Sequence, residues 1–259
     1  MKLNCIQQIL AVLLLLTAVN GFAQSQTKTD AYSIFERLEH YKQNRDTSQA
    51  LLLQSAALEC IIAEIIENEQ ALYASIQATG AIDLNSEKVL KYSNRIEKLN
   101  FILGEVINTW IPNPDYSFEK QLDQLLNKYP NHPLLLELLS EHYAEKRMYT
   151  QAESSYLKLL SIEPRDINGQ NGLAQVYENT GRYNNAFRVY MRLVELDLSR
   201  EASYRSAINM AEKTDQLEKL AERWQQLYRA HKDLEPLKKH LILVWNKLGR
   251  NKVRELSDQ

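Results

Sequence analysis

The sequence predicts an all-α fold, in which a long antiparallel helical hairpin precedes an array of shorter helix pairs. Three observations lead to this prediction. Glycine and proline are scarce, with 7 and 6 among 259 residues, so few positions interrupt a helix. Apolar residues recur at helical spacing through the first half of the chain. The second half repeats itself with a fixed period, as the pair Tyr143 and Tyr177 illustrates.

Charge is nearly balanced, with 31 Lys and Arg against 33 Asp and Glu and a formal net charge of −2. A nucleic-acid-binding domain usually carries a basic excess, so we expect no nucleic-acid partner. Apolar residues make up 44% of the chain, which is enough for a sizeable core. The composition is that of an ordinary helical protein.

Residues 1–23 resemble a secretory signal peptide. Lys2 precedes an apolar run over 9–19, and Gly21-Phe22-Ala23 provides a small-x-small cleavage site. The run is shorter than the roughly 20 residues that span a bilayer, although an N-terminal membrane anchor is the alternative. We therefore expect an exported chain, periplasmic or secreted, without an integral membrane segment after cleavage. Residues 24–30 are polar and are predicted to form a disordered lead-in.

Removal of the signal peptide would leave Cys60 as the sole cysteine. One cysteine forms no intrachain disulfide and builds no zinc site. The apolar neighbours Leu58, Ile61 and Ile62 favour a buried, inert thiol. Stability must then come from packing.

Residues 31–112 are predicted to form the N-terminal helical hairpin region. Aromatic and apolar residues over 32–41 recur every three positions, as on one face of a helix. Asp46 and Gln49 resemble a capping signal before a long helix over 48–79 that lacks glycine and proline. A second long helix over 86–110 carries an apolar seam with steps of three and four. We expect these two helices to pair antiparallel, and the first helix and part of the repeat region to pack on helix 48–79.

Pro112 and Pro114 end this region, and repeats are predicted over 113–232, most clearly over 131–232. Six positions recur at one constant separation, which we call the period: Leu139, Tyr143, Tyr149, Ala152, Tyr156 and Leu159 return as Leu173, Tyr177, Tyr183, Ala186, Tyr190 and Val194. A third unit is looser, because Leu220 replaces the small alanine and its turn lacks glycine.

This pattern resembles the tetratricopeptide repeat, whose usual length is about 34 residues. The resemblance implies a right-handed α-solenoid of helix pairs, in which the first helix of each pair lines a concave groove. Residues 233–259 would then form a C-terminal capping helix and tail.

The sequence carries no recognisable catalytic motif. No His-Glu-x-x-His, Glu-x-x-His pair, phosphate loop or Gly-x-Ser-x-Gly is present. The five histidines are scattered, and the glutamates at 59, 64, 67 and 69 are interpreted as a solvated helix face. We predict a protein that is not an enzyme, with no catalytic residues, no cofactor and no metal.

Polar residues on the first helices suggest a peptide-binding groove instead. By register the groove carries acidic residues in one unit, amides in the next and basic residues in the third. Amides can satisfy the backbone of an extended ligand, and Arg205 with Asn209 could hold a carboxylate. Some tetratricopeptide-repeat proteins bind a C-terminal carboxylate with a set of Lys, Asn and Arg side chains. In this sequence Glu137 and Glu141 stand at two of those positions, so this carboxylate site is not carried over intact. The candidate groove residues are Glu137, Glu141, Asn171, Gln175, Arg205, Asn209 and Lys213.

The predicted function is a non-catalytic scaffold that binds a protein or peptide segment in the groove. The alternative is a structural component of an envelope complex that acts through the N-terminal hairpin. A regulatory subunit of an enzyme is a third interpretation that nothing in the chain supports or excludes. The long apolar seam of the hairpin would also allow a homodimer.

Overall fold

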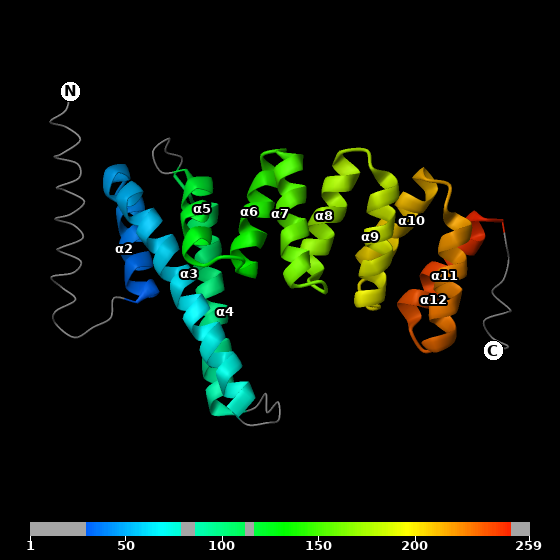
Figure 1. Ribbon diagram of the computed structural model, residues 1–259, viewed down its shortest axis with the longest axis horizontal. Helices are drawn as coiled ribbons and strands as arrows, with labels where there is room; N and C mark the ends of the chain where they lie inside the picture. The colour runs from blue at the N-terminus through cyan, green and yellow to red at the C-terminus, as the bar shows by residue number, and fades with distance from the viewer. Residues whose placement is uncertain (1–29, 79–85, 112–116, 250–259) are drawn as a thin grey trace. The chain divides into compact units, whose positions relative to one another are not determined.

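The computed structural model describes residues 30–78, 86–111 and 117–249, which form helices and loops without a strand. They fall into two compact units, Met1–Gln121 and Leu122–Gln259, and Figure 1 traces the order of the helices within each. The all-α fold is confirmed. The expected signal peptide, most of the polar lead-in and the prolines at 112 and 114 lie outside the described residues.

The first unit holds α2 (Ala31–Gln43), α3 (Thr47–Ala78) and α4 (Glu87–Asn108). Side chains that accept backbone N–H groups of the first turn begin all three helices. Asp30, which the sequence assigns to the lead-in, instead caps α2 by accepting the Ser33 N–H at 3.0 Å. Asp46 caps α3 through the Gln49 N–H at 3.1 Å, as its spacing predicts. The expected long helices are therefore present, with bounds close to those predicted.

Two contacts show that α3 and α4 run antiparallel. Near the start of α3, the buried amide of Gln54 donates to the Ile111 carbonyl and accepts its N–H, both at 3.0 Å. Farther along α3, Glu64 accepts from Arg95 of α4, with 2.7 Å between Oε1 and Nε. Later residues of α3 thus meet earlier residues of α4, which confirms the predicted hairpin.

Glu64 joins all three helices of this unit. Besides the Arg95 guanidinium, its carboxylate accepts the Ala31 N–H of α2 at 3.0 Å. The same guanidinium lies over the Tyr32 ring, 4.5 Å from the centroid. The interpretation of Glu64 as part of a solvated face is therefore wrong, because a charge-assisted network holds it. The packing of α2 on α3 is confirmed; any part the repeats play there stays a prediction.

Helix α3 is apolar enough, over Thr47–Gln77, to cross a membrane by length and composition alone, with mean hydropathy 1.6. Its packing accounts for this character. Leu58, Ile61, Ile62 and Ile65 are fully buried in the hairpin unit, and 53% of the apolar window is covered by protein. Cys60, expected to be buried, is only half-buried, and it is not part of a disulfide.

The second unit repeats its helices with the period of the sequence. The starting residues of α6, α8, α10 and α12 follow one another by one period, and so do those of α7, α9 and α11. α5 (Phe118–Lys128) begins in the first unit and ends in the second. The helices are α6 (Pro133–Glu145), α7 (Tyr149–Ile162), α8 (Ile167–Asn179), α9 (Tyr183–Leu196), α10 (Glu201–Lys213), α11 (Leu217–Ala230) and α12 (Glu235–Lys247).

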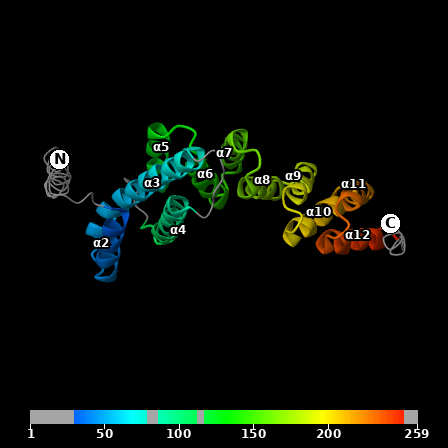
Figure 2. The same ribbon diagram turned by 90° about the horizontal axis from the view of Figure 1, so that it is seen from below.

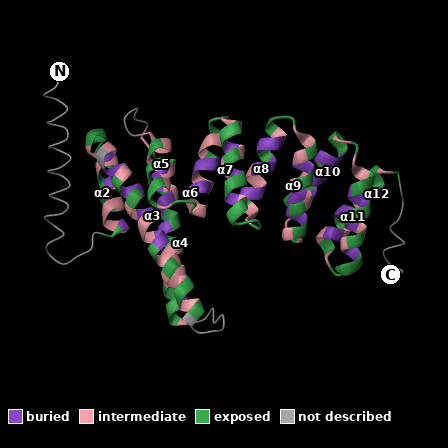
Figure 3. Ribbon diagram, viewed as in Figure 1, coloured by how far each residue is buried: buried purple, intermediate pink, exposed green. Residues whose placement is uncertain are grey.

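These helices form two layers. Figure 2 shows α6, α8, α10 and α12 along one side of the second unit and α7, α9 and α11 along the other. We call these sides the first-helix face and the second-helix face. Figure 3 shows buried residues recurring along these helices, and the apolar ones join in one core that runs from Leu136 to Trp245. Ala152 and Ala186 are fully buried, as expected of small residues that let paired helices approach closely. Leu220 takes their place in the third pair and is also fully buried.

One turn position also recurs with the period. Arg147, Gly181, Asp215 and Gly249 follow one another by one period, and all have positive φ, from 54° to 72°. Each directly follows the C-cap of a first helix. Glycine suits this left-handed conformation, whereas arginine and aspartate adopt it at a cost.

Candidate functional site

The candidate groove residues occupy equivalent positions on successive first helices. Glu137, Asn171 and Arg205 form one row at intervals of one period, and Glu141, Gln175 and Asn209 form a second. Lys213 continues a third row that begins at Glu145 and Asn179. Glu137 and Asn171 are half-buried, and the other five candidates are exposed.

The lysines at the basic end of these rows are already paired with carboxylates. Lys213 lies 3.6 Å from Glu178 of α8 and 4.6 Å from the centroid of the Tyr183 ring. One period later, Lys247 pairs with Glu212. Lys239 pairs with Glu201 at 3.2 Å, and the pKa of Glu201 is lowered first by the Lys239 hydrogen bond and then by its charge.

Arg205 and Asn209 are more available than Lys213. Both are exposed, and among the described residues neither side chain forms a hydrogen bond or ion pair. The basic end of the groove, as the sequence predicts it, is therefore largely neutralised by the chain itself. Arg205 is the cation of that set without such a pair.

The acidic end differs, because its glutamates are not paired. Within the described residues, Glu137, Glu141 and Glu145 form no ion pair. The pKa of Glu137 is raised, first by burial and then by the charge of Asp166, while a hydrogen bond from Asn168 partly opposes this. The pKa of Glu141 is raised by the crowding of protein atoms around its carboxyl, although the side chain reaches solvent, and then by Glu137 and Glu145.

A buried phenol lies beside these carboxyls. Tyr156 of α7 is 3% exposed, and its ring and hydroxyl lie against Gly172 of α8, where any Cβ would collide with them. Burial raises the pKa of Tyr156 well above 10, and the charges of Glu141 and Glu137 raise it further. The absence of a side chain at Gly172 therefore leaves space for the Tyr156 ring and hydroxyl beside the acidic end.

The sequence alone does not single out Tyr156 and Gly172 as site residues. It assigns Tyr156 to the space between helices, and Gly172 is one small residue tolerated at a helix start. Gly172 and Ser206 occupy the same repeat position, as do Tyr156 and Tyr190. A small residue that recurs together with a tyrosine at this period is the sequence pattern that could have identified the contact.

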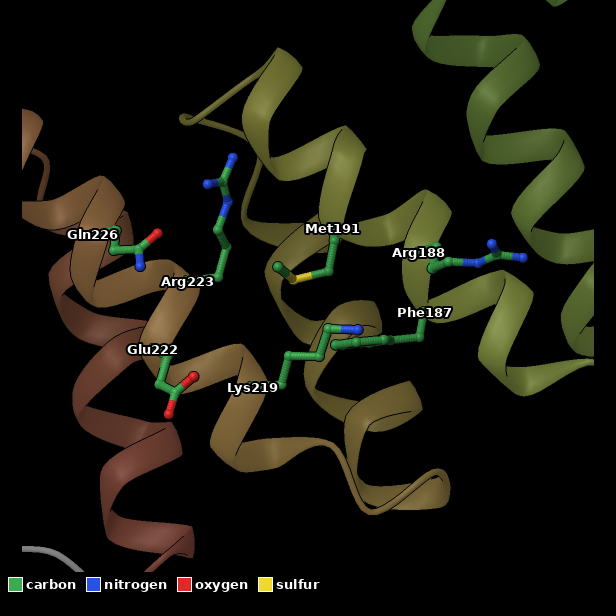
Figure 4. Close-up of a pocket in the computed structure, with 7 residues that line it drawn as sticks. All are labelled: Phe187, Arg188, Met191, Lys219, Glu222, Arg223 and Gln226. Atoms are coloured by element: carbon green, nitrogen blue, oxygen red, sulfur yellow. The ribbon is translucent and has the colours of Figure 1, made fainter.

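The second-helix face carries a hollow of about 350 Å³ between α9 and α11. In Figure 4 the Lys219 side chain lies along the Phe187 ring, with 6.0 Å between Nζ and the ring centroid. Arg223, at the rim, pairs with Glu195 at 2.8 Å. The residues that line the hollow are Phe187, Arg188, Met191, Lys219, Glu222, Arg223 and Gln226.

In the described part of the chain, no group of three or more His, Cys, Asp or Glu side chains could hold a metal ion. The first-helix face offers amides, carboxylates and one unpaired guanidinium. These groups can bind a polypeptide by hydrogen bonds and charge.

Comparison with known proteins supports the repeat. Residues 168–200 match the family model of the tetratricopeptide repeat. Among solved structures, MamA (AMB-1) is 14% identical over 88% of this chain and 96% of its own, with a TM-score of 0.39. PilW, a widely conserved type IV pilus biogenesis factor, is 15% identical over 83% of this chain and 100% of its own, with a TM-score of 0.41. No curated protein matches the chain.

The family match falls on α8 and α9, the pair that carries Asn171 and Gln175. It confirms the resemblance on the second of the two units that suggested it. The chain contains a tetratricopeptide repeat at residues 168–200, within an all-α series of helix pairs of the kind that serves as a scaffold for protein–protein interaction.

Proposed function

We propose that this protein is a non-catalytic scaffold that binds an extended protein segment along the first-helix face of α6, α8 and α10. The observation that carries the proposal is the alignment of polar side chains in rows one period apart, while the tyrosines of the same pairs pack inward. Asn171 and Gln175 stand at the centre of the rows, where amides can pair with the N–H and C=O groups of a bound backbone. A preformed surface of this kind loses little conformational freedom on binding.

Site-specific photo-crosslinking tests which face binds the partner. A photoreactive phenylalanine analogue at Gln175 or Asn209 should crosslink a protein in cells of the source organism. The same analogue at Gln226, on the second-helix face, is the matched control. Crosslinks from the control position alone would contradict groove binding.

Bulky substitution gives an independent test on the same positions. Gln175→Trp and Asn209→Trp place large side chains on exposed positions, so they should reduce partner binding without loss of helicity. Gln226→Trp, also exposed, should leave binding unchanged. Equal binding by all three variants would refute the groove assignment.

A second candidate function is assembly through the N-terminal hairpin. Its supporting observation is an apolar surface on the first unit: Phe101 is 69% exposed and borders a hollow of about 540 Å³ with Tyr32, Phe35 and Ile102. Phe101→Arg should then disrupt a homodimer or larger complex, measured by sedimentation velocity, while crosslinks from Gln175 persist. If Phe101→Arg abolishes both assembly and the Gln175 crosslinks, partner binding along the first-helix face depends on assembly through the hairpin.

We also propose that the chain is exported, periplasmic or secreted, and that cleavage follows Ala23. The proposal rests on the charged start, apolar run and small-x-small site within residues 1–23. Mass spectrometry of the protein purified from its source should find Gln24 at the N-terminus. An intact N-terminus in a membrane fraction would instead support an N-terminal anchor.

A further inference from the structure

We propose that Glu137, Glu141 and the phenol of Tyr156 form a site for one lysine or arginine side chain of the bound segment. This inference rests on the proposed binding of a segment along the first-helix face and adds the chemistry that this segment carries. It differs from the expectation drawn from the sequence, in which Arg205 with Asn209 would hold a carboxylate of the ligand.

The distribution of unpaired charge gives the first argument. At the basic end, Lys213, Lys239 and Lys247 each pair with a glutamate of the preceding first helix. At the acidic end, Glu137 and Glu141 are one helical turn apart on α6 and have no ion-pair partner among the described residues. The charge still available to a ligand on this face is therefore mainly negative.

The Tyr156 phenol gives the second argument. One period later, the equivalent Tyr190 donates its hydroxyl proton to Glu178 Oε2 at 3.2 Å. The position equivalent to Glu178 in the first pair is Ala144, which offers no acceptor. The Tyr156 hydroxyl accordingly has no hydrogen-bond partner among the described residues, although the residue is only 3% exposed.

The surroundings of the Tyr156 hydroxyl also favour a cationic ligand. Gly172 has no Cβ that would collide with it, and after burial the charges of Glu141 and then Glu137 contribute most to the raised pKa of Tyr156. A phenol can accept an N–H from a cation and donate its own O–H to a carboxylate. A cationic side chain would meet both requirements at once, because it supplies several N–H donors and compensates two negative charges.

Synthetic peptides test the site directly. The probes are fluorescein-labelled decapeptides of alternating Ala and Lys, Ala and Arg, or Ala and Glu, titrated against the purified full chain by fluorescence anisotropy. The basic peptides should bind and the acidic peptide should not. Glu137→Gln combined with Glu141→Gln should weaken the basic peptides by about tenfold or more, and the wild-type affinity should fall as salt is added.

Two further variants separate this site from general attraction to an anionic surface. Tyr156→Phe keeps the ring but removes the hydroxyl, so it should weaken binding by roughly two- to fivefold with unchanged circular dichroism. Glu105→Gln combined with Glu222→Gln neutralises two exposed carboxylates, one on α4 and one on α11, and should change nothing. Equal binding by wild type and the Glu137→Gln, Glu141→Gln variant would overturn the proposal, as would no binding of the basic peptides at about 1 mM.

A third variant distinguishes failure of this site from failure of the wider groove. Asn171→Ala combined with Gln175→Ala leaves the acidic end intact. If basic peptides bind this variant as well as wild type and Gln175 yields no crosslinks in cells, the acidic site stands while the extended groove fails. If the Gln175 crosslinks persist but removal of the two glutamates leaves peptide binding unchanged, the groove stands and the cation site is refuted.

Discussion

Lys213 of α10 reaches back to Glu178 of α8, with 3.6 Å between Nζ and Oε1, and the pair returns one period later as Lys247 and Glu212. These two ion pairs link the C-terminal ends of successive first helices. The period that repeats the helices thus also repeats an ion pair. A partner carboxylate would have to compete with Glu178 for Lys213.

Reversing one charge of the Lys213–Glu178 ion pair should destabilise the second unit modestly. Lys213→Glu places two carboxylates together, so it should lower the free energy of unfolding by about 0.5–1 kcal/mol. Adding Glu178→Gln should recover most of that loss, because glutamine removes the negative charge and keeps an acceptor for the Tyr190 hydroxyl. Urea denaturation followed by circular dichroism measures both. Asn209→Glu, an exposed substitution on the same helix, is the control; no difference between it and Lys213→Glu would contradict the pairing.

The left-handed turn position makes a second prediction. Arg147 has φ 59° where the next repeat has Gly181 at φ 72°. Arg147→Gly should therefore stabilise the protein by about 0.5–1 kcal/mol, because relief of backbone strain exceeds the added entropy of the unfolded chain.

Gly181→Ala is the reciprocal change and should cost about 1 kcal/mol or more. Nothing lies within 4 Å of the position of the added Cβ, so the cost would come from the backbone and not from a clash. Asp215→Gly should gain less than Arg147→Gly, since aspartate tolerates this conformation better. Destabilisation by Arg147→Gly would show that strain is not what these turns share.

The predicted helices agree with the structure with few errors because periodicity and scarce helix breakers determine them locally. The third repeat illustrates the limit. Its turn lacks glycine in the sequence, yet Asp215 adopts φ 54° and α11 begins one period after α9. Arg147 and Asp215 both adopt the left-handed turn without glycine, so the absence of this glycine does not break the array.

Side-chain partners across the fold are beyond sequence reasoning. Gln54 follows three leucines and gives no local signal, yet its buried amide makes two hydrogen bonds with the backbone of Ile111, which is distant in the chain. Likewise, the rows of groove residues follow from the period, but the pairing of Lys213 with Glu178 depends on how two helices face each other. For this reason the positions of the groove residues can be predicted from the sequence, whereas which of their charges are already paired within the chain cannot.

Gly172 gives a third prediction. Gly172→Ala introduces a Cβ that would collide with the ring and hydroxyl of Tyr156, so it should cost about 1–3 kcal/mol of unfolding free energy. In a Tyr156→Leu background the shorter side chain should absorb most of that cost, which a double-mutant cycle measures. Gly104→Ala, a mid-helix position with nothing within 4 Å, should instead stabilise by about 0.5–1 kcal/mol. Additive effects of Gly172→Ala and Tyr156→Leu would refute the contact.

The glutamates of the acidic end make stability depend on pH. Burial and neighbouring charges raise the pKa of Glu137 and Glu141 above 4.5 in the folded state. Above 4.5 the folded protein therefore binds more protons than the unfolded chain, and stability falls as pH rises through the raised pKa. The penalty is complete at neutral pH and disappears well below 4.5, where both states are protonated.

Neutralising both carboxyls should remove this dependence. Glu137→Gln with Glu141→Gln should raise the free energy of unfolding at neutral pH by about 0.2–0.5 kcal/mol, the usual effect of a like-charge pair four residues apart. The gain should vanish in acid, because the wild-type carboxyls are then uncharged. Thermal unfolding at several pH values measures it, with Glu222→Gln as the exposed control. A gain that is equal at neutral and acid pH would show that the charges of these glutamates do not oppose folding, and that the acidic end is less crowded than the geometry indicates.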